Sequence, residues 1–182
     1  NGSIHPAAVE VCDLEDNDCD ALTFGSGAYN QNTLTSVSTL DAAVSGSSAG
    51  DVLLVCSDHV GRLQIPHDLE LEGLGGLLQT LDGGVEAVGT GLTLTLVDLT
   101  VANATNTGIA YGGSTLNTTN VVVTNNAEGG IVASTATLTD SVVSGNASVD
   151  GAGVWTDVDL VLAGTTSVTG NTATGLGGGV YA

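Results

Sequence analysis

The chain has 182 residues, enough for one domain, and a formal net charge of −19 with Arg62 as its only Lys or Arg. Nucleic acids and anionic membrane surfaces are bound through many basic side chains, so the composition excludes both classes of partner. Hydrophobic residues make up 42% of the chain, with one Phe, one Trp, three Tyr and no Met, which predicts an aliphatic core. No apolar run reaches the roughly 18 residues that a membrane-spanning helix needs, so we expect no direct membrane insertion.

Residues 1–24 form a polar, acidic segment that contains the first two cysteines. Cys12 and Cys19 are close in sequence, which favours a small disulfide loop in an oxidising compartment. The same segment carries the candidate metal ligands Asp13, Asp16, Asn17, Asp18 and Asp20. Alternating acidic residues are typical of the first ligands of a calcium loop, and such dense carboxylates repel one another unless a cation or solvent intervenes. We therefore expect Ca²⁺ at this loop; the alternative is a solvated acidic cap held by the disulfide alone.

Residues 25–50 form a connection rich in Gly, Ser, Asn and Thr, with a short helix expected at 40–44. From Asp51 onward, short apolar and β-branched runs that end at turn residues predict strands. The expected strands are 51–55, 62–65, 68–72, 77–81, 93–96, 99–101, 118–123, 135–139, 142–143, 160–162 and 167–168. Cys56 follows the apolar run 52–55, so we expect a buried free thiol, with a covalent link to another chain or to a missing segment as the alternative.

A short phrase recurs along the C-terminal part of the chain, with an Asn after Val or Thr and then a Gly before a β-branched residue. Its members are Asn103, Asn126, Asn146 and Asn171, with Gly108, Gly130, Gly153 and Gly179. The steps of 23, 20 and 25 residues between the Asn residues predict coils stacked on coils. We expect Asn126, Asn146 and Asn171 at one corner, where an Asn tolerates left-handed backbone geometry and hydrogen-bonds to the turns above and below. Each Gly is expected to let the backbone bend sharply into the next strand.

This phrase resembles the repeats of the polymorphic outer membrane proteins and related bacterial surface β-helices. The closest copy is 168–173 followed by 177–181, with Val where that family often has Phe. Residues 51–84 are similar to the opening coils of pectate-lyase-like β-helices. The resemblance covers about residues 35–182 and implies an all-β fold, a right-handed single-stranded parallel β-helix of about six coils at 51–182. Residues 1–24 would form an acidic, disulfide-bonded cap before it.

The N-terminal segment resembles a second pattern, the MopE-type repeat of bacterial surface proteins. The residues that carry this likeness are Cys12-Asp13 and Asp16-Asn17-Asp18-Cys19-Asp20, whereas Leu14 and Ala21 stand where the pattern has Gly. A copper role finds no support in the histidines, because His5, His59 and His67 show no metal-ligand spacing and are expected at the surface.

Together these features predict a non-enzymatic extracellular or cell-surface rod of a bacterium, acting in adhesion, a surface coat or filament assembly. The end near Gly177–Ala182 carries no polar cap. We therefore expect either a homo-oligomer by end-to-end stacking or further coils in a longer protein, of which this chain is a processed or truncated part. A surface glycan is a further expected partner.

Two alternatives remain open at this point. A carbohydrate-active β-helix enzyme would need a basic proton abstractor, and only Arg62 is present, or converging carboxylates, for which the alternating pairs Glu70/Glu72 and Asp157/Asp159 are candidates without evident partners. An ice-binding face would need Thr93, Thr95, Thr135, Thr137 and Thr139 to align. The unequal repeat steps argue against such regular ranks.

Overall fold

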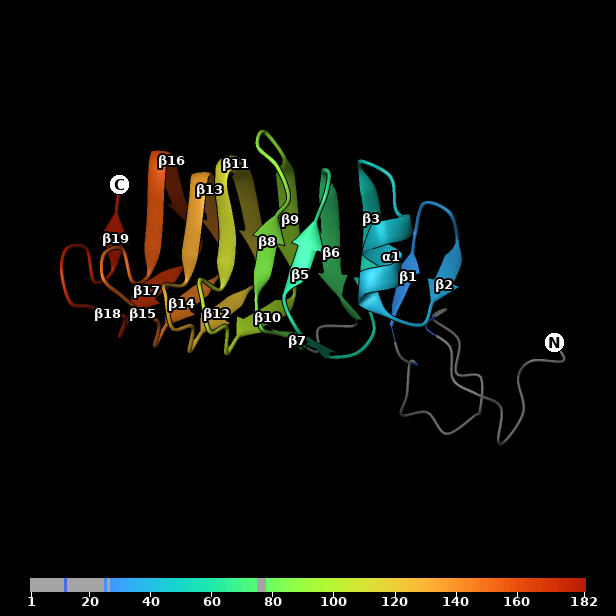
Figure 1. The fold of residues 1–182 in the computed structure, drawn as a ribbon, viewed down its shortest axis with the longest axis horizontal. Helices are drawn as coiled ribbons and strands as arrows, with labels where there is room; N and C mark the ends of the chain where they lie inside the picture. Colours follow the sequence, from blue (N-terminus) through green and yellow to red (C-terminus); the bar gives the residue numbers. More distant parts are fainter. Residues whose placement is uncertain (1–11, 13–24, 26, 75–77) are drawn as a thin grey trace, which may run out of the picture.

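The structure is a computed structural model that describes Cys12, Gly25, residues 27–74 and residues 78–182. It is an elongated stack of coils in which strands from successive coils lie side by side, from β3 at one end to β16 at the other (Figure 1). The expected all-β parallel β-helix is confirmed. The stack has three faces, which we call A, B and C in the order in which each coil passes through them.

Each face is a ladder of parallel strands. Face A holds β3 (Asp51–Val55), β6 (Leu69–Gly73), β9 (Thr93–Val97) and the second halves of β11 (Ile109–Thr119), β13 (Ile131–Thr139) and β16 (Val154–Ala163). Face B holds β4 (His59–Val60), β7 (Gln79–Asp82), β10 (Leu99–Ala102), β12 (Val122–Thr124), β14 (Val142–Ser144) and β17 (Ser167–Thr169). Face C holds β5 (Leu63–Ile65), β8 (Val85–Ala87), the first halves of β11, β13 and β16, and β19 (Val180–Tyr181). A small separate ladder joins β15 (Ala147–Ser148) to β18 (Thr172–Ala173).

The core consists of columns of aliphatic side chains that run along the stack. Parallel pairing places one inward residue of each coil directly over its equivalent in the next, because the side-chain period of a strand is two. On face C the column is Leu63, Val85, Ile109, Ile131, Val154 and Val180. On face B it is His59, Leu81, Val101, Val123, Val143 and Val168. The strand alternation seen in the sequence therefore becomes a continuous dry interior.

An antiparallel hairpin and a helix cover the N-terminal end of this interior. β1 (Ala28–Asn30) pairs antiparallel with β3 and with β2 (Thr35–Val37). The helix α1 (Leu40–Gly46) begins after Thr39, whose side chain accepts a hydrogen bond from the Ala42 N–H as an N-cap. Its buried residues Leu40, Ala43 and Val44 join the aliphatic core. The segment expected as a connection with a short helix at 40–44 therefore contains two strands and a helix. The helix is present and extends to Gly46.

The disulfide corrects the expected pairing of cysteines. Cys12 is bonded to Cys56, with their Cα atoms 5.9 Å apart, so it does not pair with Cys19, and Cys56 is not a free thiol. Cys12 lies beside the β1–β2 hairpin, where its carbonyl oxygen accepts a hydrogen bond from Ser36 Oγ of β2. Cys56 follows β3 directly. The bond spans 44 residues of chain and, in the chain-entropy account, stabilises the fold by about 4 kcal/mol. Cys19 lies outside the described residues.

Most of the expected strands are present, with one clear error at 118–123. β11 ends at Thr119 and β12 begins at Val122, because Asn120 takes a positive φ of 52° and turns the chain from face A to face B. The Asn120 Nδ2 donates to Asp98 Oδ1, the equivalent turn position one coil earlier. Val121 continues the β-branched run through the corner, which hides the turn from a reading of the sequence.

The corner that follows face B contains a ladder of asparagine side chains. Asn126 and Asn146 are buried, with relative exposures of 1%. Asn126 donates from its backbone N–H (3.1 Å) and its Nδ2 (2.8 Å) to Asn146 Oδ1. Asn146 donates in the same way to Asn171 Oδ1, at 3.0 and 2.9 Å. Each side chain therefore replaces the backbone hydrogen bonds that a parallel ladder loses where its strands stop.

The first member of the expected set does not belong to this ladder. The coil of Asn103 places Ala104 at the ladder position, and the Ala104 N–H donates to Asn126 Oδ1 at 2.9 Å. Asn103 instead has a positive φ of 56°. The residues just before the other ladder positions also have positive φ values: Asn125 at 57°, Gly145 at 67° and Gly170 at 64°. The expectation of left-handed geometry was therefore wrong for the ladder residues and applies to the position before them.

Three of the repeat glycines, Gly108, Gly130 and Gly153, make room for the ladder asparagines without a positive φ. Among the positive φ values of the described residues, none belongs to Gly108, Gly130, Gly153 or Gly179. A Cβ at Gly108 would lie 2.5 Å from Asn126 Nδ2, and one at Gly130 would lie 2.8 Å from Asn146 Nδ2. A real side chain cannot approach so closely, so glycine is required where the coil passes the asparagine of the next coil.

We predict that Asn146→Ala lowers the free energy of unfolding by about 3 kcal/mol. The substitution leaves the Asn126 N–H without its acceptor and removes the Asn146 donor to the Val123 carbonyl, and a buried unsatisfied group costs about 1–3 kcal/mol. Asn103→Gly is the matched control, because Asn103 is exposed and has a φ that glycine favours; its effect should stay within about 0.5 kcal/mol. Urea denaturation measures both, and equal losses would contradict the ladder.

Candidate functional site

The expected calcium ligands cannot be placed. Asp13, Asp16, Asn17, Asp18 and Asp20 all lie outside the described residues. Within residues 27–74 and 78–182, together with Cys12 and Gly25, no group of three His, Cys, Asp or Glu side chains is arranged to hold a metal ion. The same part of the chain contains no helix that is both long and apolar enough to cross a membrane.

The candidate carboxylate pairs lie on coils far apart in the stack. Glu70 and Glu72 point outward from β6, where Glu72 accepts a hydrogen bond from Gln31 Nε2. Asp157 and Asp159 belong to β16. Strands β9, β11 and β13 stand between β6 and β16 on face A, so these two pairs do not converge on one position.

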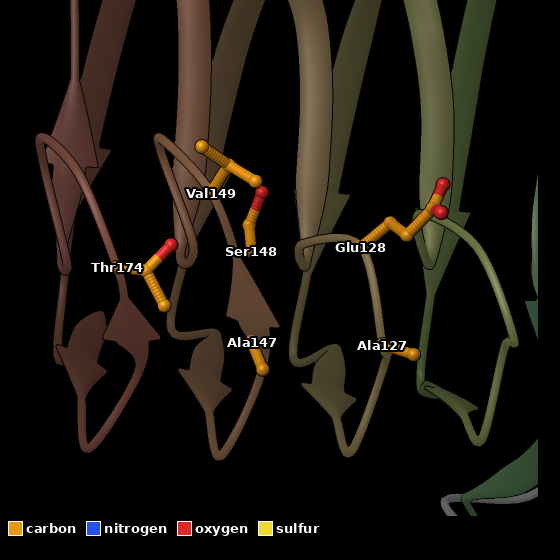
Figure 2. Close-up of a pocket in the computed structure, with 6 residues that line it drawn as sticks. All are labelled: Ala127, Glu128, Ala147, Ser148, Val149 and Thr174. Atoms are coloured by element: carbon orange, nitrogen blue, oxygen red, sulfur yellow. The ribbon is translucent and has the colours of Figure 1, made fainter.

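An open groove runs along the corner beside the asparagine ladder. It encloses about 560 Å³ and is lined by Ala127, Glu128, Ala147, Ser148, Val149 and Thr174. Figure 2 shows that these side chains come from three successive coils, with Ala147 and Ser148 on β15. Glu128 supplies its only acidic lining residue, so the groove offers a shallow surface and not a set of converging catalytic groups.

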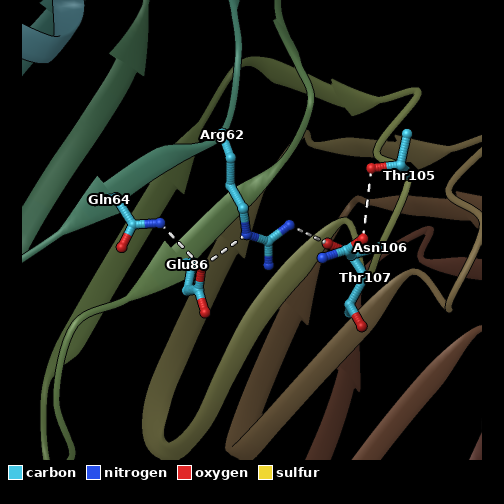
Figure 3. Close-up of polar contacts among 6 residues, drawn as sticks. All are labelled: Arg62, Gln64, Glu86, Thr105, Asn106 and Thr107. Carbon is cyan, nitrogen blue, oxygen red and sulfur yellow. Dashed lines mark hydrogen bonds and ion pairs between the residues drawn. The ribbon is translucent and has the colours of Figure 1, made fainter.

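Arg62 is engaged in a network that ties three coils together (Figure 3). Its Nε donates to Glu86 Oε2 at 2.9 Å, and its Nη1 donates to the Thr107 carbonyl oxygen at 2.9 Å. Gln64 Nε2 donates to the same Glu86 oxygen at 2.9 Å. The hydrogen bonds from Gln64 and Arg62 lower the pKa of Glu86 below 4.5. A guanidinium held in this way is placed to stabilise the stack and not to abstract a proton.

The histidines differ from the expectation that all lie at the surface. His59 is 9% exposed and lies in the face B column, with its Nδ1 3.8 Å from Asp41 Oδ2 and its Nε2 without a hydrogen-bond partner. His67 is partly exposed and contacts the Ser47 carbonyl oxygen through Nε2 at 3.0 Å. His5 is outside the described residues.

The outward threonines of face A lie in regular ranks. Thr93, Thr115 and Thr135 are in register on β9, β11 and β13, as are Val97, Thr119 and Thr139. The middle rank is Thr95, Asn117 and Thr137. The expectation that unequal repeat steps prevent this alignment was wrong, because the extra residues lie in the turns and in local register shifts within β11 and β16. The middle rank ends at Glu70 of β6 and at Val161 of β16, and the rank of Thr93, Thr115 and Thr135 ends at Asp159 of β16.

The last coil presents the largest set of exposed apolar side chains beside an uncovered strand. β16 pairs with β13 along its length, but on its other side only Val154 and Trp155 are paired, with β19. The exposed residues of this coil are Trp155, Val158, Val161, Leu162, Leu176, Val180 and Tyr181. Leu162 is 47% exposed although it continues the inward column of Leu96, Thr118 and Leu138 on face A. This end is therefore the candidate interaction site.

Sequence reasoning located this end from its lack of a polar cap, but it did not identify the residues involved. The sequence predicted a strand at 160–162 and gave no signal for a role of Trp155 on the same strand, β16. The signal for the leucines was present in the column register, which places Leu160 and Leu162 over the core. Comparisons with protein families, characterised proteins and solved structures found no match.

We predict that the stability contributed by Glu86 is present above pH 4.5 and is lost as the pH falls through its lower folded-state pKa. The sign follows because the unfolded chain binds the proton more readily than the folded chain does. Urea denaturation in a pH series measures this, and Glu86→Gln should remove that component of the acid dependence. Gln64→Leu and Arg62→Met should each reduce it, since each removes one donor to Glu86. An unchanged pH dependence in all three variants would contradict the network.

Proposed function

We propose that the chain is a non-enzymatic structural β-solenoid of a bacterial cell surface that associates with a second copy through its last coil. The single observation that carries this proposal is the uncovered edge of β16 with its exposed aliphatic side chains. An unpaired strand edge is a template for pairing with another chain. An edge flanked by apolar side chains gains further from burial, at about 25 cal/mol per Å² of apolar surface removed from water.

The occupant that fits this end is a further aliphatic coil, supplied by a second copy in this proposal and by a continuing chain in the alternative. Leu160 and Leu162 continue two core columns, so the complementary surface is another coil with aliphatic side chains at the same spacing. Asn171 ends the described ladder in the position where Asn126 and Asn146 each donate their backbone N–H to the next coil. A Cβ at Gly179 would meet nothing within 4 Å, which leaves room for an approaching chain.

The structure of the N-terminal end determines whether the proposed association forms a closed dimer or a fibre. The β1–β2 hairpin and α1 cover the core there, and the outer strand β2 presents only Thr35–Val37, largely exposed. Contact between two copies of the last coil is isologous and closes as a two-fold dimer. Growth into fibres additionally requires the free edge of β2 to accept a strand.

The proposed setting is extracellular, and adhesion to a surface glycan is its proposed role. A disulfide between Cys12 and Cys56 suits an oxidising compartment. Calcium at the acidic N-terminal loop is proposed as a stabilising ion. The loop follows Cys12 in the chain, and the disulfide links Cys12 to Cys56 at the end of β3. The non-enzymatic part of the proposal is supported by the separation of the two carboxylate pairs along the stack.

We predict concentration-dependent dimerisation, measured by light scattering coupled to gel filtration and by sedimentation velocity. Leu162→Lys and Leu176→Lys should weaken it at least tenfold, because each places a charge on a surface that becomes buried. Val60→Lys is the matched control, since Val60 is 80% exposed on β4, away from the last coil, and should leave dimerisation unchanged. A monomer at every concentration would contradict the proposal, and filaments in the electron microscope would replace the dimer by stacking through β2.

Thermal unfolding measured with calcium and then with a chelator tests the proposed ion. If calcium braces the N-terminal loop, chelation lowers the unfolding temperature, and Asp18→Asn lowers the calcium-dependent part of it. Equal unfolding temperatures in calcium and chelator would contradict a bound ion while leaving the test of the dimer intact.

A further inference from the structure

The only tryptophan of the chain lies on the outer surface of the stack. Trp155 is 44% exposed and points outward from β16 on face C. One side of its ring meets Tyr181 of β19, with the ring centroids 6.1 Å apart and the planes at 84°. A large aromatic side chain left open to solvent in a chain with 3% aromatic residues is a candidate binding surface.

A hollow lies on the side of Trp155 that faces β11 and β13. It encloses about 190 Å³ and is lined by Gly112, Val132, Ala133, Trp155 and Asp157. Val132 is the register partner of Trp155 on β13, and Gly112 contributes no side chain to the lining. The lining is apolar except for the carboxylate of Asp157, and the volume suits a single small group and not a drug-sized ligand, which needs about 300 Å³ or more.

Electrostatics decides what kind of group this hollow favours. The net charge of the chain is −19, and Arg62 is committed to Glu86. The ion pairs found within the described part of the chain involve Asp41 and Glu86, so neither neutralises Asp157. An anionic ligand is repelled here, whereas a cation is concentrated by the field of the whole protein.

We propose that the hollow between Trp155 and Asp157 binds an alkylated ammonium group, such as the trimethylammonium of choline. The face of an indole attracts cations more strongly than other aromatic rings do. The methyl groups of such a cation bury against Val132, Ala133 and the indole, and the carboxylate of Asp157 balances the charge. The hollow borders β11 and β13, whereas the proposed dimer contact is tested at Leu162 and Leu176, which do not line the hollow.

The fluorescence of Trp155 tests the proposal directly, because no other tryptophan contributes. Titration of the intact protein with choline should give a saturable change in emission that weakens as salt is added. The neutral isostere 3,3-dimethylbutan-1-ol has the same shape without the charge and should bind about three- to fivefold more weakly or not at all. An equal response to both compounds would show burial without recognition of charge and would overturn the proposal.

Two aspartate variants locate the site. Asp157→Asn should weaken choline binding about three- to fivefold, whereas Asp159→Asn makes the same change of charge two residues along β16, outside the hollow, and should have a smaller effect. Equal effects would assign the binding to net charge alone and overturn the site. Saturation by maltohexaose or cellohexaose without saturation by choline would replace the cation by a neutral saccharide, and an unchanged emission with every compound would remove the site.

Discussion

The structure depends on one constraint, which is that every coil must repeat the same residue positions directly above the coil before it. In a parallel stack, the backbone groups of each strand find their partners only in the neighbouring coils. A shift of one residue would turn the aliphatic columns outward, because the side-chain period of a strand is two. The asparagine ladder maintains the register at the corner, where the strands stop and backbone pairing alone would leave gaps.

The same constraint explains why the two ends of the stack differ. At the N-terminal end, β1 reverses direction and pairs antiparallel with β3, which ends the parallel series. Asp51 at the start of β3 accepts hydrogen bonds from the Ser48 backbone and from Asn30 Nδ2, and these lower its pKa. At the other end the series stops with its columns exposed on β16. The proposed association and the hollow beside Trp155 both belong to this last coil, but they use different surfaces of it.

Features that repeat along the chain were predicted correctly from the sequence more often than features that depend on a single contact. The alternation in Thr93–Leu96 and the run 51–55 correctly predicted strands, and the recurring asparagines correctly predicted a shared corner. The position of Asn103 was misjudged because two neighbouring positions both favour asparagine, one for its backbone geometry and one for its side chain. The pairing of Cys12 with Cys56 was not predicted, because closeness in sequence favoured Cys19. The sequence does not show that Cys12 lies beside the end of β3 in the fold.

The alignment of Thr93, Thr115 and Thr135 shows a second limit of the sequence. Repeat lengths count all residues of a coil, whereas alignment depends only on the paired ones, and the turns and the register shifts within β11 and β16 absorb the difference. For the candidate site, the sequence indicated the correct end of the chain. It could not show that Trp155 stands beside Gly112 and Val132, because their strands come from different coils.

Amide hydrogen exchange measured by NMR tests the central claim most directly. If the asparagine ladder carries the register, the backbone amides of Ala104, Asn126 and Asn146 exchange as slowly as those of the core strands, although the three residues lie outside strands. The Asn103 amide, at the exposed position next to the ladder, donates to the Thr124 carbonyl oxygen over a longer 3.4 Å and would exchange faster. Rapid exchange at Asn126 and Asn146, at the rate of exposed loops, would contradict a register held by the ladder.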